Sequence, residues 1–243
     1  MTMKTLFIVG AGGLGKEVVD IVQSSPLAAQ YALAFIDDTV APGTIVHGVE
    51  VVGSRAFLRA VDPEQSAVCV AIGSPAVRRD LIGEIESWGL SLPAIVDASA
   101  LIRPSVVLGP GVIVGARAFV SSQSVIGAHA VINPGVLGGH DVVIGPFAVI
   151  GGGAMLSGGA KVGEGTLVGA GASILLNTPV GDWATVGMGA AVYAAVENGT
   201  TVLGNPARAL PVLRKKNEAP APTRVPSPTL APPDNIAPPP MTA

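Results

Sequence analysis

The sequence predicts an α/β domain followed by a β-solenoid, and three observations lead to this prediction. Residues 1–97 contain short apolar runs interrupted by a glycine-rich turn and a segment with helical spacing. Further on, aliphatic residues recur at every sixth position over about ninety residues. The composition, with 32 glycines and only 4% aromatic and 13% charged residues among 243, is typical of stacked, tightly turning β structure.

Short apolar runs in the first part predict parallel strands with a helix after the first. The run from Lys4 to Val9 leads directly into the turn GAGGLG, and residues 16–23 show helical spacing. Two more strands are predicted at 32–36 and 67–72. Because the carboxyl ends of parallel strands meet at one edge of a sheet, the residues that follow these strands should lie together.

The glycine turn and the acids after the second strand form the outline of a nucleotide-binding fingerprint. A G-x-G-x-x-G turn lets a phosphate approach the backbone at a helix N-terminus, although the same glycines can simply form a tight βα turn. We expect Gly12, Asp37 and Gly73 to converge. The α/β part ends near Asp97, which is too short for two mononucleotide-binding halves. This length favours a mononucleotide or a nucleotide-sugar over a full dinucleotide.

A six-residue period dominates the second part of the chain. A period of six fits neither an α-helix nor hairpins with variable turns, but it fits short strands joined by regular corners. The residue after each periodic position is often glycine, which we interpret as a corner where the backbone needs the relaxed sterics of glycine. Only Gly138 interrupts the aliphatic series, which runs Ile102, Leu108, Val114, Val120, Ile126, Ile132, Gly138, Ile144, Ile150, Leu156, Val162, Val168, Ile174, Val180, Val186 and Val192.

Charge, hydropathy and cysteine content exclude several classes of function. A formal net charge of -3 provides no general positive field for nucleic acid. No run of about 18 apolar residues is present, so no membrane span is predicted. The single cysteine, Cys69, cannot form an intramolecular disulfide, which fits a cytoplasmic location. The repeats contain too few histidines for a zinc site, so no metal is expected.

The segments VGAGGLGKEV, FIDD, AIGSPAVRR, GGHDVVIG and GNPARAL resemble the sugar O-acyltransferases of the sialic acid O-acetyltransferase type, which include nucleotide-amino-sugar N-acetyltransferases. The resemblance extends from about residue 4 to residue 210. It implies a Rossmann-like domain over 1–97, a left-handed parallel β-helix of hexapeptide repeats over 98–200 and a capping segment over 201–215. The Pro-rich residues 216–243 are expected to be disordered. The family is usually homotrimeric, with active sites in clefts between neighbouring helices.

His140 is the candidate general base. Transfer of an acetyl group from acetyl-CoA to a sugar amine or hydroxyl requires removal of a proton from the acceptor, and a neutral imidazole suits that task near pH 7. The family motif places a histidine followed by an acid at this point, so the resemblance assigns Asp141 as the partner that makes the imidazole more basic. From the residues alone, His140 can equally be a surface histidine at a corner. We interpret His129 as solvated and His47 as a loop residue.

The resemblance also implies the binding residues. The nucleotide-sugar would contact Gly12, Gly13, Leu14, Asp37, Asp38 and Gly73, while the acetyl-CoA positions would be Val149, Gly158, Ala170, Met188 and Arg208. Family members often carry a histidine where this chain has Val149, which leaves the acyl group open. Arg208 can meet a CoA phosphate or be a solvated arginine of the capping segment.

Three functions remain open at this point. The first is acetyl transfer to a nucleotide-linked sugar, which both parts of the chain support. The second is an NAD(P)-dependent oxidoreductase, which the glycine turn suggests and the short domain opposes. The third is a catalytically reassigned trimeric scaffold, which the replacement at Val149 suggests.

Overall fold

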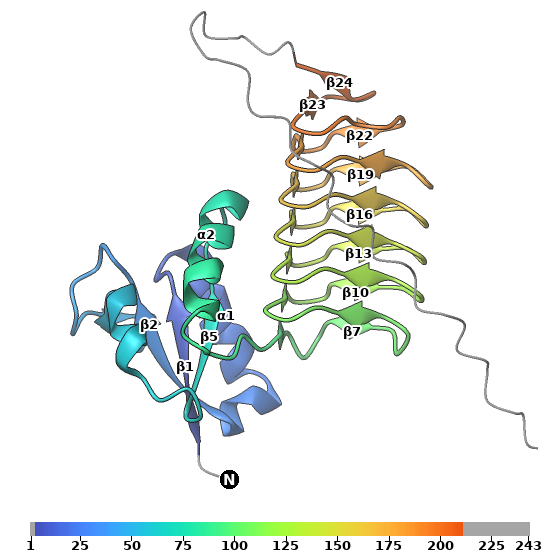
Figure 1. Cartoon of the computed structure of the whole chain (residues 1–243). Helices are drawn as coiled ribbons and strands as arrows, with labels where there is room; N and C mark the ends of the chain where they lie inside the picture. Colours follow the sequence, from blue (N-terminus) through green and yellow to red (C-terminus); the bar gives the residue numbers. More distant parts are fainter. Residues whose placement is uncertain (1–2, 211–243) are drawn as a thin grey trace, which may run out of the picture. The chain divides into compact units, whose positions relative to one another are not determined.

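The computed structural model describes residues 3–210 (Figure 1). The expected Pro-rich tail at 216–243 and the last residues of the expected capping segment lie outside this range. Within it, no helix has the length and apolar character needed to cross a membrane.

The N-terminal part is a five-stranded sheet in the order β3-β4-β2-β1-β5 with two α-helices. The parallel neighbours β2, β1 and β5 confirm that three predicted strand ends meet at one edge. The first helix begins three residues earlier than predicted because the glycine turn itself forms its first turn. The elements are β1 (Lys4–Val9), α1 (Gly13–Gln23), the 3₁₀ helix η1 (Pro26–Ala29), β2 (Tyr31–Ile36), β3 (Ile45–Val46), β4 (Val49–Gly53), the 3₁₀ helix η2 (Arg55–Ala60), β5 (Ser66–Val70) and α2 (Pro75–Glu86).

The second part is a stack of two-residue strands that repeat every six residues, as the sequence predicts. Its first strand, β6, precedes residue 98 by a few positions and already pairs with β9. The strands are β6 (Ile95–Val96), β7 (Leu101–Ile102), β8 (Val107–Leu108), β9 (Ile113–Val114), β10 (Phe119–Val120), β11 (Val125–Ile126), β12 (Val131–Ile132), β13 (Leu137–Gly138), β14 (Val143–Ile144), β15 (Val149–Ile150), β16 (Met155–Leu156), β17 (Lys161–Val162), β18 (Leu167–Val168), β19 (Ser173–Ile174), β20 (Pro179–Val180), β21 (Thr185–Val186), β22 (Ala191–Val192), β23 (Thr201–Leu203) and β24 (Arg208–Ala209).

Three sheets, parallel except for β24 at the end of one of them, form the three faces of a left-handed β-helix (Figure 1). We call them face 1, which runs from β7 to β22 through every third strand, face 2, from β8 to β20, and face 3, from β6 to β21 with β23 and β24. From β6 to β22, each strand pairs in register with the strand eighteen residues away on the same face, so equivalent residues of successive coils lie above one another.

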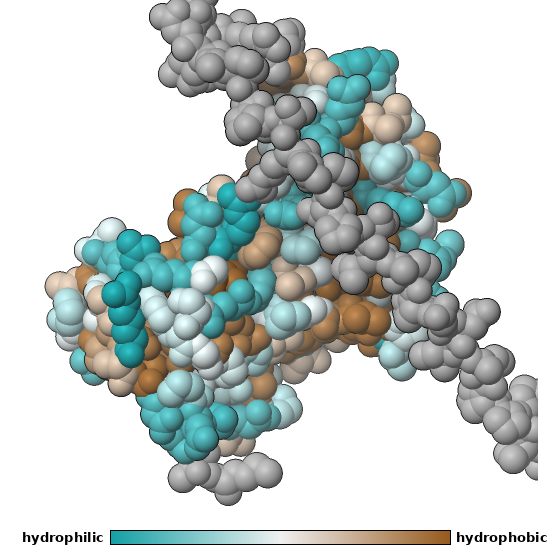
Figure 2. Space-filling model, viewed as in Figure 1, coloured by the Kyte–Doolittle hydropathy of each residue, from teal (hydrophilic) through white to brown (hydrophobic). Residues whose placement is uncertain are grey.

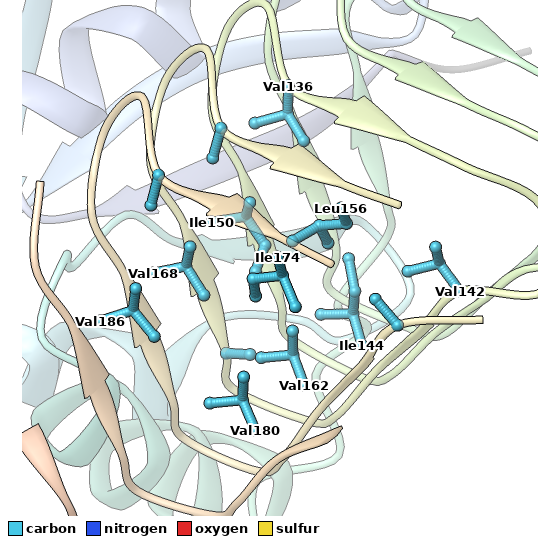
Figure 3. Packing of buried hydrophobic residues seen from close by; sticks show 14 of the residues in the cluster. Val136, Val142, Ile144, Ile150, Leu156, Val162, Val168, Ile174, Val180 and Val186 are labelled. Atoms are coloured by element: carbon cyan, nitrogen blue, oxygen red, sulfur yellow. The ribbon is translucent and has the colours of Figure 1, made fainter. Parts of the chain in front are cut away.

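The core of the helix consists of the second residue of each strand and, in most coils, of the residue that precedes the strand, such as Val136, Val142 or Ala148. Figure 3 shows these aliphatic side chains, such as Ile144, Ile150 and Leu156, gathered inside the coil. Full burial of a Val or Ile side chain stabilises the fold by about 1.5–3 kcal/mol. Ile102 and Leu108 are only partly buried because they lie at the open first end of the helix. The regular stack therefore holds each corner at a fixed position.

Glycine is required after the periodic positions for a different reason from the one that we expected. Their φ angles are not positive; instead, the corner residue two places later is left-handed, as in Asp141 with φ of 58°. Glycine is needed because the next coil passes too closely. A Cβ on Gly139 would lie 2.6 Å from the backbone nitrogen of Gly158. A shortage of space, rather than backbone strain, therefore explains these glycines.

Candidate active site

The corner between β13 and β14 presents His140 and Asp141 to solvent. The backbone N–H of Asp141 donates to the carbonyl of Ser122 in the preceding coil at 2.9 Å, which anchors the turn. Nδ1 of His140 lies 2.6 Å from Oδ2 of Asp141, and the imidazole is 66% exposed. When Nδ1 donates to this carboxylate, Nε2 carries the free lone pair and faces away from it. The pair has the geometry of an oriented general base.

A glycine in the next coil makes room for the imidazole. A Cβ on Gly158 would lie 2.5 Å from Nε2 of His140, so only glycine leaves the ring its observed position. The N–H of Gly159 donates to the carbonyl of His140 at 2.8 Å and ties the two corners together. Of the predicted acetyl-CoA positions, Gly158 is the one that the structure places beside the candidate base.

The other predicted acetyl-CoA positions lie elsewhere on the chain. Ala170 and Met188 occupy successive coils of a second corner, between faces 3 and 1, and Met188 is 80% exposed. Val149 lies on face 3, where it packs against the apolar core of the N-terminal part. Arg208 is exposed on β24 and borders a cavity of about 500 Å³ at the end of the helix. A single chain does not gather these residues into one pocket.

A groove that begins one coil above the His140 corner was not predicted. It has a volume of about 330 Å³ and lies along the outer side of face 1. Ser157, Leu175 and Tyr193 line it and follow Gly139 at successive steps of eighteen residues, so they stack above the residue that precedes His140. This eighteen-residue step was available in the sequence and could have identified them.

The glycine turn in the N-terminal part combines crowded and open positions. A Cβ on Gly15 would lie 2.0 Å from the carbonyl oxygen of Gly10, so the helix starts too close to the strand for any side chain. In contrast, a Cβ on Gly12, Gly13 or Gly73 would meet no atom within 4 Å. These three predicted residues therefore line open space at one edge of the sheet, where a ligand can approach the backbone.

The two acids after β2 are already engaged by the protein. Burial raises the pKa of Asp37, but hydrogen bonds from the N–H of Ala11, from Thr39 and from the N–H of Val40 outweigh it and leave the pKa lowered. Asp38 accepts a bond from the backbone N–H of Arg55 at 2.9 Å. Asp37 thus holds the glycine turn as an ionised carboxylate. Leu14 is half-buried and packs against the adjacent core.

His129 is buried, so the prediction that it is solvated is wrong. Helix α2 covers its corner, and the side chain stacks on Phe147 at 5.3 Å between ring centroids. Nε2 lies 3.3 Å from Oε1 of Glu86, while the buried Nδ1 has no hydrogen-bond partner among the described residues. Burial lowers the pKa of His129, and the nearby Arg78 acts in the same direction, whereas Glu86 opposes them. His47, as predicted, lies in a turn, where Nε2 is 2.7 Å from Asp20.

Acid should destabilise the protein through His129. Below about pH 6.5 the imidazole of His129 takes up a proton in the unfolded chain that it binds less readily in the folded chain. The free energy of unfolding therefore decreases as the pH decreases. Asparagine tolerates the left-handed backbone, so we test His129→Asn. Between about pH 7.5 and pH 5.5, we expect the Tm of this variant to decrease by less than the Tm of the native chain. Thermal unfolding followed by circular dichroism measures this, and equal losses in both proteins would contradict the assignment.

Helix α2 also contributes a residue whose role the sequence did not indicate. Arg78 is buried and donates hydrogen bonds to backbone carbonyls on both parts of the chain. Its neighbour Arg79 stacks over the ring of Trp183, 4.6 Å from the centroid.

Within residues 3–210, no group of three or more His, Cys, Asp or Glu side chains is arranged to hold a metal ion.

Known proteins match both the fold and the order of its parts. The family described as PglD N-terminal domain matches residues 5–85. The perosamine N-acetyltransferase from Caulobacter crescentus, solved as a histidine-to-asparagine mutant with CoA and GDP-perosamine, is 30% identical with a TM-score of 0.81, over 86% of this chain and 98% of that one. A comparison with curated proteins gave no match.

Two further solved structures agree. WeeI from Acinetobacter baumannii is 31% identical with a TM-score of 0.79, and the acetyltransferase domain of PglB from Neisseria gonorrhoeae, in complex with acetyl coenzyme A, is 30% identical with a TM-score of 0.71. Each is covered over 100% of its length by 86% of this chain. The chain therefore belongs to the sugar O-acyltransferase family of the sialic acid O-acetyltransferase type, which includes the nucleotide-amino-sugar N-acetyltransferases.

Proposed function

We propose that this enzyme transfers an acetyl group from acetyl-CoA to an amine or hydroxyl of a nucleotide-linked sugar, with His140 as the general base. The observation that carries the proposal is the exposed imidazole, which Asp141 orients from one side and for which Gly158 leaves room. The relative from Caulobacter crescentus binds CoA and GDP-perosamine, which supports this pair of substrates.

We assign each partner of the pair a step in the transfer. Nε2 of His140 accepts the proton as the acceptor nitrogen or oxygen attacks the thioester carbonyl, the carbon–sulfur bond breaks, and the departing thiolate takes up a proton. Asp141 holds the ring in the tautomer that leaves Nε2 free and stabilises the imidazolium that forms. The thioester is already activated, so no covalent enzyme intermediate is required.

The proposed substrate sites lie on different parts of the chain. The groove lined by Ser157, Leu175 and Tyr193 suits an extended acyl carrier arm whose thioester ends near His140. We assign Gly158, Ala170, Met188, Val149 and Arg208 to the acetyl-CoA site of an assembly, since one chain does not bring them together. Gly12, Gly13, Leu14, Asp37, Asp38 and Gly73 are proposed to form the nucleotide-sugar site.

A homotrimer is part of the proposal. Face 1 exposes an apolar row that includes Leu101, Leu137 and Met155, and face 2 exposes a second row that includes Val107 and Val143. Figure 2 shows hydrophobic surface over the first coils, around β7. The corner that carries His140 lies between the two rows. A second copy that covers these rows would therefore place its own residues beside the base.

A charge in the first row should break the assembly. Leu137→Lys places a cation in the proposed interface, so we expect the mass in solution to fall from that of a trimer to that of a single chain. Leu167→Lys, at the equivalent outward position of face 3, is the matched control and should keep the native mass. Light scattering coupled to size-exclusion chromatography measures both. A native chain that is monomeric, or a trimer that survives Leu137→Lys, would contradict the interface.

The activity is tested by release of free thiol from acetyl-CoA in the presence of UDP- and GDP-linked amino sugars. Release that depends on the sugar, with the acetylated sugar identified by mass spectrometry, is the expected result. Reduction of NAD(P) without thiol release would favour an oxidoreductase.

We place the enzyme in the cytoplasm, where the buried thiol of Cys69 stays reduced. Burial raises the pKa of this thiol to about 12.

A further inference from the structure

Arg78 connects two parts of the chain through backbone carbonyls. Its side chain is 1% exposed, and Nη1 donates to the carbonyls of Ile72 at 2.6 Å and Gly73 at 3.4 Å, in the loop after β5. Nε donates to the carbonyl of His129 at 3.1 Å, and Nη2 donates to that of Phe147, at two corners of the β-helix. Within the described residues, the guanidinium forms no ion pair with a carboxylate.

Such an arginine is costly to bury. Removing a guanidinium from water without an opposite charge opposes folding, and burial lowers the pKa of Arg78 to about 10. An apolar side chain would fill the same space without that cost. What arginine adds is a planar, rigid set of donors that fixes several acceptors relative to one another.

The loop that Arg78 holds belongs to the proposed nucleotide site. Gly73 faces open space, and Ile72 lies against the glycine turn, since a Cβ on Gly10 would be 2.7 Å from Cδ1 of Ile72. The loop therefore forms one wall beside the turn. If it moved, the wall would move with it.

The other end of the connection leads to the candidate base. Phe147 and His140 lie on the same coil, at the two ends of the segment that contains β14. This segment is held in a packed parallel sheet, so its two ends keep a fixed position relative to one another. A continuous path thus runs from the Gly73 loop through Arg78 and Phe147 to the His140 corner.

We propose that Arg78 is a positioning residue for the acceptor substrate: it fixes the nucleotide-binding loop at Gly73 to the β-helix and so sets where the sugar is presented to the transfer corner. The inference rests on the proposed function. It holds whether the sugar meets His140 of its own chain or of a second copy, because in both cases the N-terminal part must keep one orientation on its helix.

Arg79 provides a matched control. It is the next residue of α2 and also contacts the β-helix, through Trp183, but it forms no hydrogen bond to the Ile72–Gly73 carbonyls. Substitution of Arg79 therefore perturbs the contact between helix and coil while the loop stays held. Substitution of Arg78 perturbs both.

The test compares Arg78→Lys with Arg79→Lys in the full chain, with Arg78→Met as a second variant. Lysine keeps the charge but cannot reach all four carbonyls. We expect Arg78→Lys to raise KM for the nucleotide-sugar about tenfold, the effect of losing one or two hydrogen bonds, while KM for acetyl-CoA stays the same. Arg79→Lys should leave both values unchanged. A purely structural role would affect both substrates alike.

Each outcome decides the inference. An unchanged KM for the nucleotide-sugar in folded Arg78→Lys, or equal rises for both substrates, overturns it while the activity stands. If the native chain transfers no acetyl group, titration calorimetry with UDP and GDP replaces the kinetics. Weaker binding in Arg78→Lys alone then supports the inference although the proposed function has failed. Equal binding in both variants, or no binding by the native chain, overturns it.

Discussion

His140→Asn is expected to lower kcat for acetyl transfer by about 10²–10⁴-fold, the range that a positioned general base contributes. The substitution removes the imidazole that we propose to accept the proton, while the exposed side chain contributes little to the core. Thiol release at saturating acetyl-CoA and nucleotide-sugar measures the loss. The KM for acetyl-CoA and the melting temperature should stay close to the native values.

A second histidine provides the control for this experiment. His47 also pairs with a carboxylate, Asp20 at 2.7 Å, but it lies in a turn of the N-terminal part. His47→Asn should keep native kcat. Asp141→Asn, which retains the left-handed backbone, should lose less activity than His140→Asn because the base remains but its orientation weakens. Native kcat in His140→Asn would remove the base from the mechanism.

The β-helix could be predicted almost residue by residue. Most of its core positions follow from one rule, since the strict six-residue period brings the second residue of each strand into the interior. The same rule placed Gly139, His140 and Asp141 at a corner. The reason for the glycines could not be predicted in the same way, because the close approach of Gly139 to Gly158 depends on the distance between coils rather than on either residue alone.

The contact between the two parts of the chain could not be predicted. His129 and His140 both lie at corners of the repeat, although His129 takes the left-handed position that Asp141 occupies, one place later than that of His140. What separates them is helix α2, which covers one corner with Glu86 and Arg78 and leaves the other free. The sequence of a repeat contains no signal for which corner a distant helix will cover. A buried arginine that bonds only to backbone carbonyls is equally hard to predict, because every residue has a backbone carbonyl and the sequence does not indicate which ones it will meet.

Gly158→Ala is the second substitution with a large expected effect, and it tests the position of the imidazole rather than its presence. The new Cβ would lie 2.5 Å from Nε2 and 2.7 Å from Cε1 of His140, and these ring atoms are its nearest neighbours. An exposed ring can rotate away, so the fold should survive with a nearly unchanged Tm. A displacement of about 1 Å at a reacting group can lower the rate about 100-fold, and we expect kcat to fall about 10–100-fold.

The kinetic signature of Gly158→Ala distinguishes two roles for the residue. If Gly158 only contacts acetyl-CoA, the added methyl group raises KM for acetyl-CoA and leaves kcat unchanged. If it makes room for the base, kcat falls even when both substrates are saturating. Gly83→Ala, on the exposed side of α2 with no atom within 4 Å of its Cβ, controls for the general effect of replacing glycine and should keep native kinetics. A native kcat in Gly158→Ala would mean that the imidazole does not act from the position seen here, because a working base cannot share that space with a methyl group.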